Sequence, residues 1–191
     1  MYGWLLPGKP KLAADLARRD AMLSHRADAV EASACIAALC ALIPVCSSRE
    51  EAVDSALDLI DKNSLAYEAV EVGKKFVNQS ASNLHDHYGD MSPVHSLNNL
   101  AVVIWAFLSF KDSFDEAIGE TICCGWDTDC TGATVGGLIG LDKGSIPESW
   151  TDPWQGRVNT AIAGVGELKL EDLVERTCKL VDQFSSESDM D

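Results

Sequence analysis

The chain has 191 residues, of which 47% are hydrophobic and 24% are charged, values typical of one soluble globular domain. Thirty Asp and Glu residues against 15 Lys and Arg give a formal net charge of −15. Such a field repels phosphate backbones, so it excludes nucleic acid as a partner and favours divalent cations. No run of about 18 apolar residues and no secretory signal pattern occur, which excludes a membrane span and predicts a cytoplasmic protein.

The seven cysteines point to thiols rather than to disulfides or a zinc ribbon. No CxxC pair occurs among them. In a cytoplasmic protein we expect them to be reduced and mostly buried, with the adjacent Cys123 and Cys124 in the core.

Apolar residues recur at helical spacing along most of the chain, and Pro10 is placed to open the first turn. The segment 29–43 is small and apolar on nearly every face, which predicts a buried central helix ended by Pro44. The predicted helices span residues 12–25, 29–43, 50–62, 65–79, 96–110, 113–124 and 131–140, with a last helix within 158–184. The sequence therefore predicts an all-α protein without strands.

Two segments have a different character. Residues 78–94 are polar and rich in histidine, with Gly89 and Pro93, and are predicted to form a long loop. Residues 185–191 form a predicted disordered acidic tail after a single domain of residues 1–184.

The stretch GWDTDC, residues 125–130, carries the most specific chemistry. Side chains two residues apart on a helix point about 200° from each other, so Asp127 and Asp129 converge only if the first caps the helix and the second lies in its first turn. Gly125 permits the tight turn that this requires. Spacing alone leaves two interpretations open: both carboxylates cap the helix, or they form half of a Mg²⁺ or Mn²⁺ site.

The segment GWDTDCTGATVGGLIG, followed by IPESW, resembles the carboxy-terminal metal motif of the ADP-ribosylglycohydrolase family, whose usual form is close to GGDTDTxAAxxGxLxGA followed by IPxxW. HSLNNLAVVIWAFL is similar to the family segment before that motif. LARRDAMLSH and MYGWLLPGKP resemble a family helix that ends in a Ser-His or Thr-His pair and the Pro-Gly turn before it. The resemblance covers nearly the whole chain, in order.

This resemblance implies a compact multi-helix orthogonal bundle with a binuclear Mg²⁺ or Mn²⁺ site at the base of a cleft, where ADP-ribose is cleaved from a modified protein side chain or a small molecule. Asp127 and Asp129 match the two metal-binding aspartates. Cys130 stands where the family has a Thr or Ser ligand. A thiol is a soft ligand that suits Mg²⁺ poorly. Either water or Thr131 therefore fills this ligand position, or the site prefers a different metal from the rest of the family.

The family's amino-terminal features, a GDALG-like segment and a Thr-Asp-Asp triplet that supplies further metal ligands, have no counterpart in this sequence. The chain therefore resembles only the carboxy-terminal part of the family and lacks the amino-terminal helices. We expect either a fragment, one half of a split enzyme, or a truncated homologue without catalysis. An amino-terminal half or a second copy is the expected partner, since a truncated bundle exposes apolar surface.

The remaining candidates are substrate-binding residues. Gly125 and Trp126 adjoin the aspartates, and the Trp126 ring either stacks on a ribose or adenine or packs against its own helix. His95 precedes Asn98 and either lines the cleft or caps a helix. The alternative function is a non-catalytic helical module that binds ADP-ribose or a protein partner.

Overall fold

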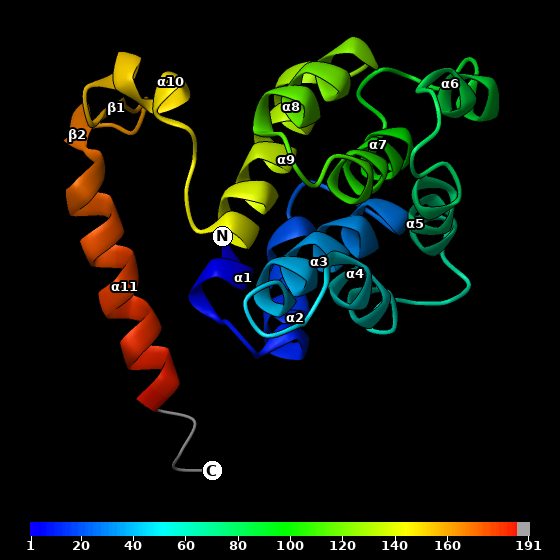
Figure 1. Cartoon of the computed structure of the whole chain (residues 1–191). Helices are drawn as coiled ribbons and strands as arrows, with labels where there is room; N and C mark the ends of the chain where they lie inside the picture. The colour runs from blue at the N-terminus through cyan, green and yellow to red at the C-terminus, as the bar shows by residue number, and fades with distance from the viewer. Residues whose placement is uncertain (187–191) are drawn as a thin grey trace.

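The computed structural model describes residues 1–186 and is built almost entirely of helices (Figure 1). The α-helices are α1 (Tyr2–Leu5), α2 (Pro10–Ala21), α3 (Asp28–Leu42), α4 (Arg49–Leu57), α5 (Leu65–Lys75), α6 (Ser82–Tyr88), α7 (Ser96–Ser109), α8 (Phe114–Cys123), α9 (Thr128–Lys143), α10 (Glu148–Thr151) and α11 (Leu170–Ser186). A short 3₁₀ turn, η1 (Asp152–Trp154), and two strands, β1 (Arg157–Asn159) and β2 (Glu167–Lys169), complete the described chain. The predicted all-α class is confirmed.

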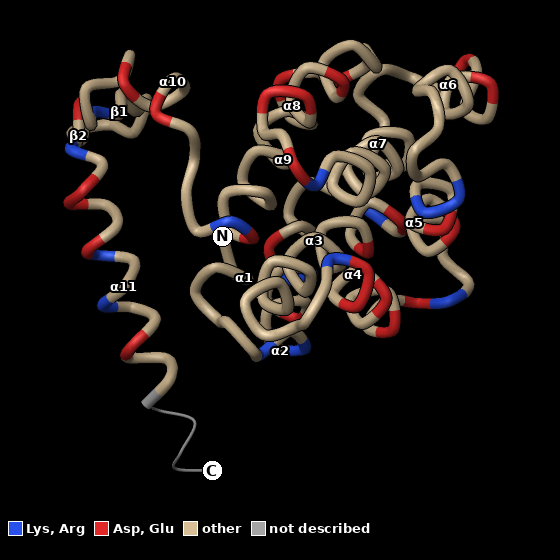
Figure 2. Tube along the Cα trace, in the orientation of Figure 1, with Lys and Arg blue, Asp and Glu red and all other residues tan. Residues whose placement is uncertain are grey.

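Two helices form the centre of the fold. Helix α7 carries no charged residue and buries nearly all its side chains, with Trp105 and Phe107 the largest of them. Helix α3 is buried on most faces, as its alanine-rich sequence predicts. Helices α2 and α4 pack against α3, and α5, α8 and α9 pack against α7. Figure 2 shows most acidic residues on the helices around α7, and α3 carries only Asp28 and Glu31, both in its first turn.

Close helix contacts depend on two glycines. A Cβ atom at Gly3 would lie 2.2 Å from the Ala37 carbonyl oxygen of α3. A Cβ atom at Gly73 of α5 would lie 2.7 Å from the Ala101 carbonyl oxygen of α7. Since no real Cβ contact is that short, α1 and α5 approach their neighbours only because these residues have no side chain.

The chain after α9 packs differently. We call residues 1–143 the helical body and residues 144–186 the C-terminal arm. From residue 140 to residue 185 no residue is buried. In Figure 1 the arm leaves the end of α9, and its helix α11 lies beside α1. Near the end of α11, the Phe184 carbonyl accepts a hydrogen bond of 2.6 Å from Lys9 Nζ, which lies between α1 and α2. The arm also touches the body through Trp150, whose indole donates to Asp115 at 2.6 Å.

Some predictions about secondary structure were wrong. The predicted loop 78–94 contains helix α6, because Leu84 is fully buried and anchors it, and Gly89 ends it at a positive φ of 44°. The arm contains strands, since β1 and β2 pair antiparallel across a glycine-containing turn. Helix α11 continues through residues 185–186, where the tail was predicted to start, and residues 187–191 lie outside the described part.

The cysteines are all free thiols, but fewer are buried than expected. Cys35, Cys40 and Cys124 are buried, whereas Cys123, expected in the core, is exposed together with Cys130 and Cys178. Cys123 is exposed because the last turn of α8 directs it to the outer surface while Cys124 faces the core. Within residues 1–186, no helix combines the length and the apolar character needed to cross a membrane.

Candidate metal centre

Asp127 occupies the N-cap position of α9, and Asp129 lies in the first turn, as the spacing predicted. The Asp127 carboxylate nevertheless accepts no capping hydrogen bond from the helix. At α4, α5 and α8 the N-cap serines Ser48, Ser64 and Ser113 do accept one. The capping interpretation of Asp127 is therefore not what the structure shows, and its carboxylate is left to bind other groups.

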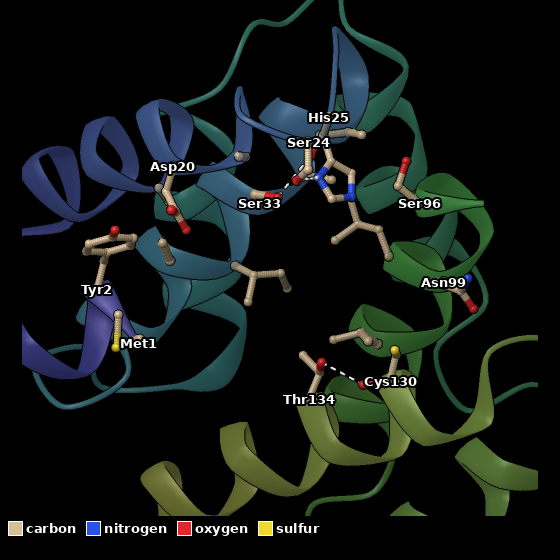
Figure 3. A pocket seen from close by; sticks show the side chains of 18 of the residues that line it. Met1, Tyr2, Asp20, Ser24, His25, Ser33, Ser96, Asn99, Cys130 and Thr134 are labelled. Carbon is tan, nitrogen blue, oxygen red and sulfur yellow. Dashed lines mark hydrogen bonds between the residues drawn. The ribbon is translucent and has the colours of Figure 1, made fainter. Parts of the chain in front are cut away.

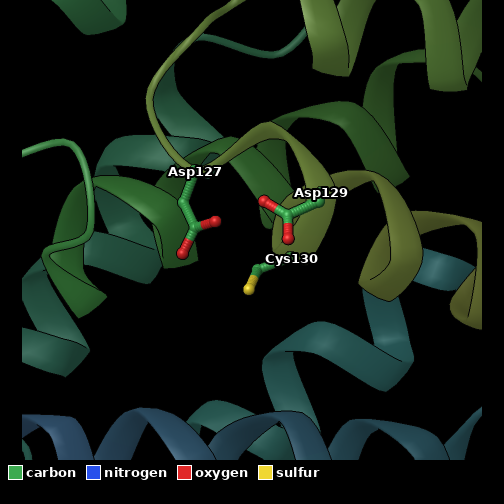
Figure 4. Close-up of side chains that lie close together, drawn as sticks. All are labelled: Asp127, Asp129 and Cys130. Atoms are coloured by element: carbon green, nitrogen blue, oxygen red, sulfur yellow. The ribbon is translucent and has the colours of Figure 1, made fainter.

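The side chains of Asp127, Asp129 and Cys130 lie together at the start of α9 (Figure 4). One oxygen of each carboxylate and the Cys130 sulfur all lie within 4.8 Å of one another. The Asp127 side chain beside it raises the pKa of the Cys130 thiol, with smaller contributions from burial and from the charges of both aspartates. The structure thus groups two hard oxygen ligands with one soft sulfur ligand.

The start of α9 is tied to the start of α7 by Asn99. Its amide oxygen accepts from the Asp127 backbone N–H at 3.4 Å. Its amide nitrogen donates to the carbonyls of Pro93 and His95 at 2.8 and 2.9 Å. Because one side chain holds both segments, the position of Asp127 follows that of α7.

The turn before Asp127 has an unusual backbone. Gly125 and Trp126 have φ values of 70° and 59°, and the second is rare for a residue with a large side chain. The Trp126 ring stacks on His85 with centroids 4.1 Å apart, and His85 Nε2 lies 2.5 Å from the Cys124 carbonyl oxygen. Helix α6 therefore stabilises the strained turn from outside.

The far end of α9 is fixed by a buried arginine. Arg49 of α4 pairs with Asp142 at 2.8 Å. It also donates to the carbonyls of Phe107 and Phe110, at 2.6 and 3.1 Å. These carbonyls lie at the C-terminal end of α7, where no following turn of the helix supplies a donor. Both ends of α9 are thus attached to α7, one directly and one through α4.

A cavity of about 650 Å³ opens beside the cluster, a size typical of small-molecule sites (Figure 3). Cys130, Thr134 and Asn99 line one side, and Asp20 and His25 line the other. Alanines and other apolar residues of α2, α3 and α7 form much of its floor. An apolar cavity with polar groups at its edges suits a ligand that has both kinds of surface.

The predicted site residues occupy different places. Thr131 also lines the cavity, but its hydroxyl donates to the Asp127 carbonyl at 2.9 Å, and its role as a metal ligand stays a prediction. His95 caps α7 by accepting from the Leu97 N–H at 3.3 Å. The buried Asn98 donates to the Ser92 carbonyl at 3.1 Å. Substrate contacts of His95, Asn98, Gly125 and Trp126 also stay predictions.

Two residues of the site were not among the predicted ones. Asn99 lines the cavity and holds Asp127, although its neighbour Asn98 was preferred. His85 supports Trp126 from a segment that was predicted to be a loop. The Asn99–Asp127 and His85–Trp126 contacts join segments far apart in sequence, so local sequence patterns do not predict them. The one available signal was that Asn99 is adjacent to the predicted site residue Asn98.

The cluster fits a divalent cation by the chemistry of its donors. Two carboxylates supply the oxygen ligands that Mg²⁺ and Mn²⁺ prefer, and their negative charges offset the positive end of the α9 dipole. Two fixed carboxylates are too few to complete the coordination of either ion. The cluster therefore offers only part of the ligand set that such an ion needs.

Comparison with known proteins gives one family. The family model described as ADP-ribosylglycohydrolase matches residues 1–187. Searches of curated proteins and of solved structures gave no match.

Proposed function

Because the chain belongs to the ADP-ribosylglycohydrolase family, we propose that it supplies the carboxy-terminal half of a divalent-metal centre that hydrolyses the glycosidic bond between ADP-ribose and a modified side chain or small molecule. Enzymes of this family generally bind divalent metals. The observation that carries the proposal is the convergence of Asp127 and Asp129, with no capping role for Asp127, beside a cavity of substrate size.

Each part of the site has a task in this reaction. Asp127 and Asp129 hold the ion, with Thr131 as a further ligand, and Asn99 keeps Asp127 in position. An ion bound there, Mg²⁺ or Mn²⁺, supplies a Lewis acid that orients and acidifies water. The proposed contacts to substrate are Gly125, Trp126, His95 and Asn98. The cavity beside Cys130 shields part of the bound substrate from bulk water.

The remaining ligands and the catalytic acid must come from elsewhere, because the cluster holds only two carboxylates. We propose that an amino-terminal polypeptide half or a second copy of this chain supplies them, since both would also cover apolar surface. Residues 1–186 then form a rigid support for one side of the centre.

Release of ADP-ribose from an ADP-ribosylated protein, measured with Mn²⁺ or Mg²⁺ and the amino-terminal half supplied, tests the proposal. Asp127→Asn and Asp129→Asn should each lower turnover by more than roughly 100-fold, since even a supporting group at a metal site contributes about 10- to 100-fold. Asp58→Asn is the matched control, because Asp58 is exposed and, within residues 1–186, its carboxylate pairs only with Lys62.

Unchanged turnover in the two Asn variants contradicts the proposal. Binding of ADP-ribose without hydrolysis, in the presence of the amino-terminal half, instead supports the alternative of a helical module that binds ADP-ribose or a protein partner. Equilibrium dialysis of Mn²⁺ against the chain alone gives a separate measurement of the half-site.

A further inference from the structure

Cys130 distinguishes this metal half-site from one made of oxygen ligands alone. Its sulfur lies within 4.8 Å of an oxygen of Asp127 and of Asp129. The side chain is exposed and points into the cavity, so neither packing nor burial explains its position (Figures 3 and 4).

The neighbouring hydroxyl has a different environment. Thr131 is buried, and its hydroxyl proton is already donated to the Asp127 carbonyl in the preceding turn. Of the two residues that follow Asp129, Cys130 is therefore the one whose side chain faces the same space as both carboxylates.

We propose that the Cys130 sulfur, in place of the Thr131 hydroxyl, is the third ligand of the ion held by Asp127 and Asp129, and that the site consequently prefers a thiophilic divalent ion such as Zn²⁺ or Co²⁺ over Mg²⁺. This inference rests on the proposed function, whose metal site it refines. On binding, the S–H bond breaks, the sulfur electron pair forms the bond to the metal and the proton leaves to solvent, with no change in oxidation state.

The preference follows from ligand chemistry. Mg²⁺ dehydrates reluctantly and takes oxygen ligands in near-octahedral geometry, so a thiolate adds little to its binding. Zn²⁺ and Co²⁺ accept sulfur and oxygen together and stand higher in the Irving–Williams order than Mn²⁺. A hydroxyl at position 130 would therefore favour hard ions such as Mg²⁺, whereas the thiol of Cys130 favours softer ions.

Co²⁺ titration of the full chain tests this, because thiolate coordination gives Co²⁺ an intense near-ultraviolet charge-transfer band that oxygen ligands do not give. We expect the band in the natural protein and its loss in Cys130→Ser, with Co²⁺ affinity lowered by roughly tenfold or more. Mg²⁺ affinity, measured by competition with Co²⁺, should not fall in the same variant.

Cys123→Ser and Cys178→Ser are the matched controls, since both cysteines are exposed and lie outside the cluster, and both should keep the band. Circular dichroism shows whether each variant is folded. Co²⁺ bound without the band, or a band that survives Cys130→Ser, overturns the inference and leaves the proposed metal site standing. Absence of Co²⁺ binding to the chain in equilibrium dialysis also overturns the inference, but not the proposed function, which assigns the remaining metal ligands to another polypeptide.

Discussion

The helical body and the C-terminal arm are both largely helical but reach opposite degrees of burial. Helix α3 in the body and helix α11 in the arm have almost the same length, 15 and 17 residues. The first is covered on most faces, whereas on the second Val174, Leu180 and Phe184 are more than 40% exposed. A helical apolar pattern therefore predicts that a helix forms, and only tertiary contacts decide how much that helix stabilises the fold.

Two arginine–carboxylate pairs give the sharpest test of this difference. Arg49 is buried in the body against Asp142, and Arg157 is exposed in the arm beside Glu167. Arg49→Ala leaves Asp142 without its partner and the Phe107 and Phe110 carbonyls without this donor, so we expect a loss of about 3–5 kcal/mol in the free energy of unfolding.

Arg157→Ala is the control and should cost at most about 1 kcal/mol, as exposed ion pairs do. Urea denaturation followed by circular dichroism measures both values. Equal losses would contradict the distinction between body and arm.

Truncated leucines extend the test to apolar contacts. Leu39 of α3 is fully buried, so Leu39→Ala should cost about 2–5 kcal/mol through lost burial and the cavity left behind. Leu180 of α11 is 42% exposed, and Leu180→Ala should cost well below the lower end of that range. If a second copy covers α11 in solution, the Leu180→Ala loss instead grows with protein concentration, which sedimentation and thermal unfolding at two concentrations would show.

The acid side of the stability profile should depend on Glu31 of the body. Hydrogen bonds from Arg18, at 2.9 and 3.0 Å, lower the pKa of Glu31 below its ordinary value of 4.5. A lowered folded pKa adds stability above the ordinary value, and this stability is lost as the pH falls through the folded pKa. Glu31→Gln should therefore destabilise the protein at about pH 7 and have less effect at about pH 3.

Urea denaturation of the natural protein and of Glu31→Gln at both pH values checks the sign. Asp58→Asn, at the exposed C-cap of α4, serves as the control. A Glu31→Gln difference that is the same at both pH values would show that Arg18 does not act through the charge of Glu31.

Removal of the arm should have the smallest effect. A chain ended after Gly144 loses residues of which 145–185 include no buried one, so its helical body should unfold within about 1 kcal/mol of the full chain under the same conditions. Near-ultraviolet circular dichroism and urea denaturation measure this. A truncated chain without cooperative unfolding would show that the arm contributes to the core.

Much of the fold could be predicted from local sequence because its signals are local. Pro10 opens α2, Ser48 and Ser113 cap α4 and α8, and the small apolar residues of segment 29–43 form the buried α3. The position of Asp127 at the start of α9 could be predicted for the same reason.

The parts that could not be predicted depend on contacts distant in sequence. Helix α6 has seven residues, too few for a periodic pattern, and is held by the burial of Leu84. The arm strands have three residues each, and pairing determines them more than pattern does. Neither the stack of His85 on Trp126 nor the bond from Asn99 to Asp127 leaves a local signal.

The left-handed conformation of Trp126 has a consequence for the order in which the protein assembles. Its stabilising partner His85 lies 39 residues before Cys124, whose carbonyl oxygen it contacts, so the chain must close that long loop before the turn gains support. The helices around α3 and α7 can form and pack without it. We therefore expect the turn at residues 125–127 to form late in folding, and native-state hydrogen exchange should find its amides among the first to open.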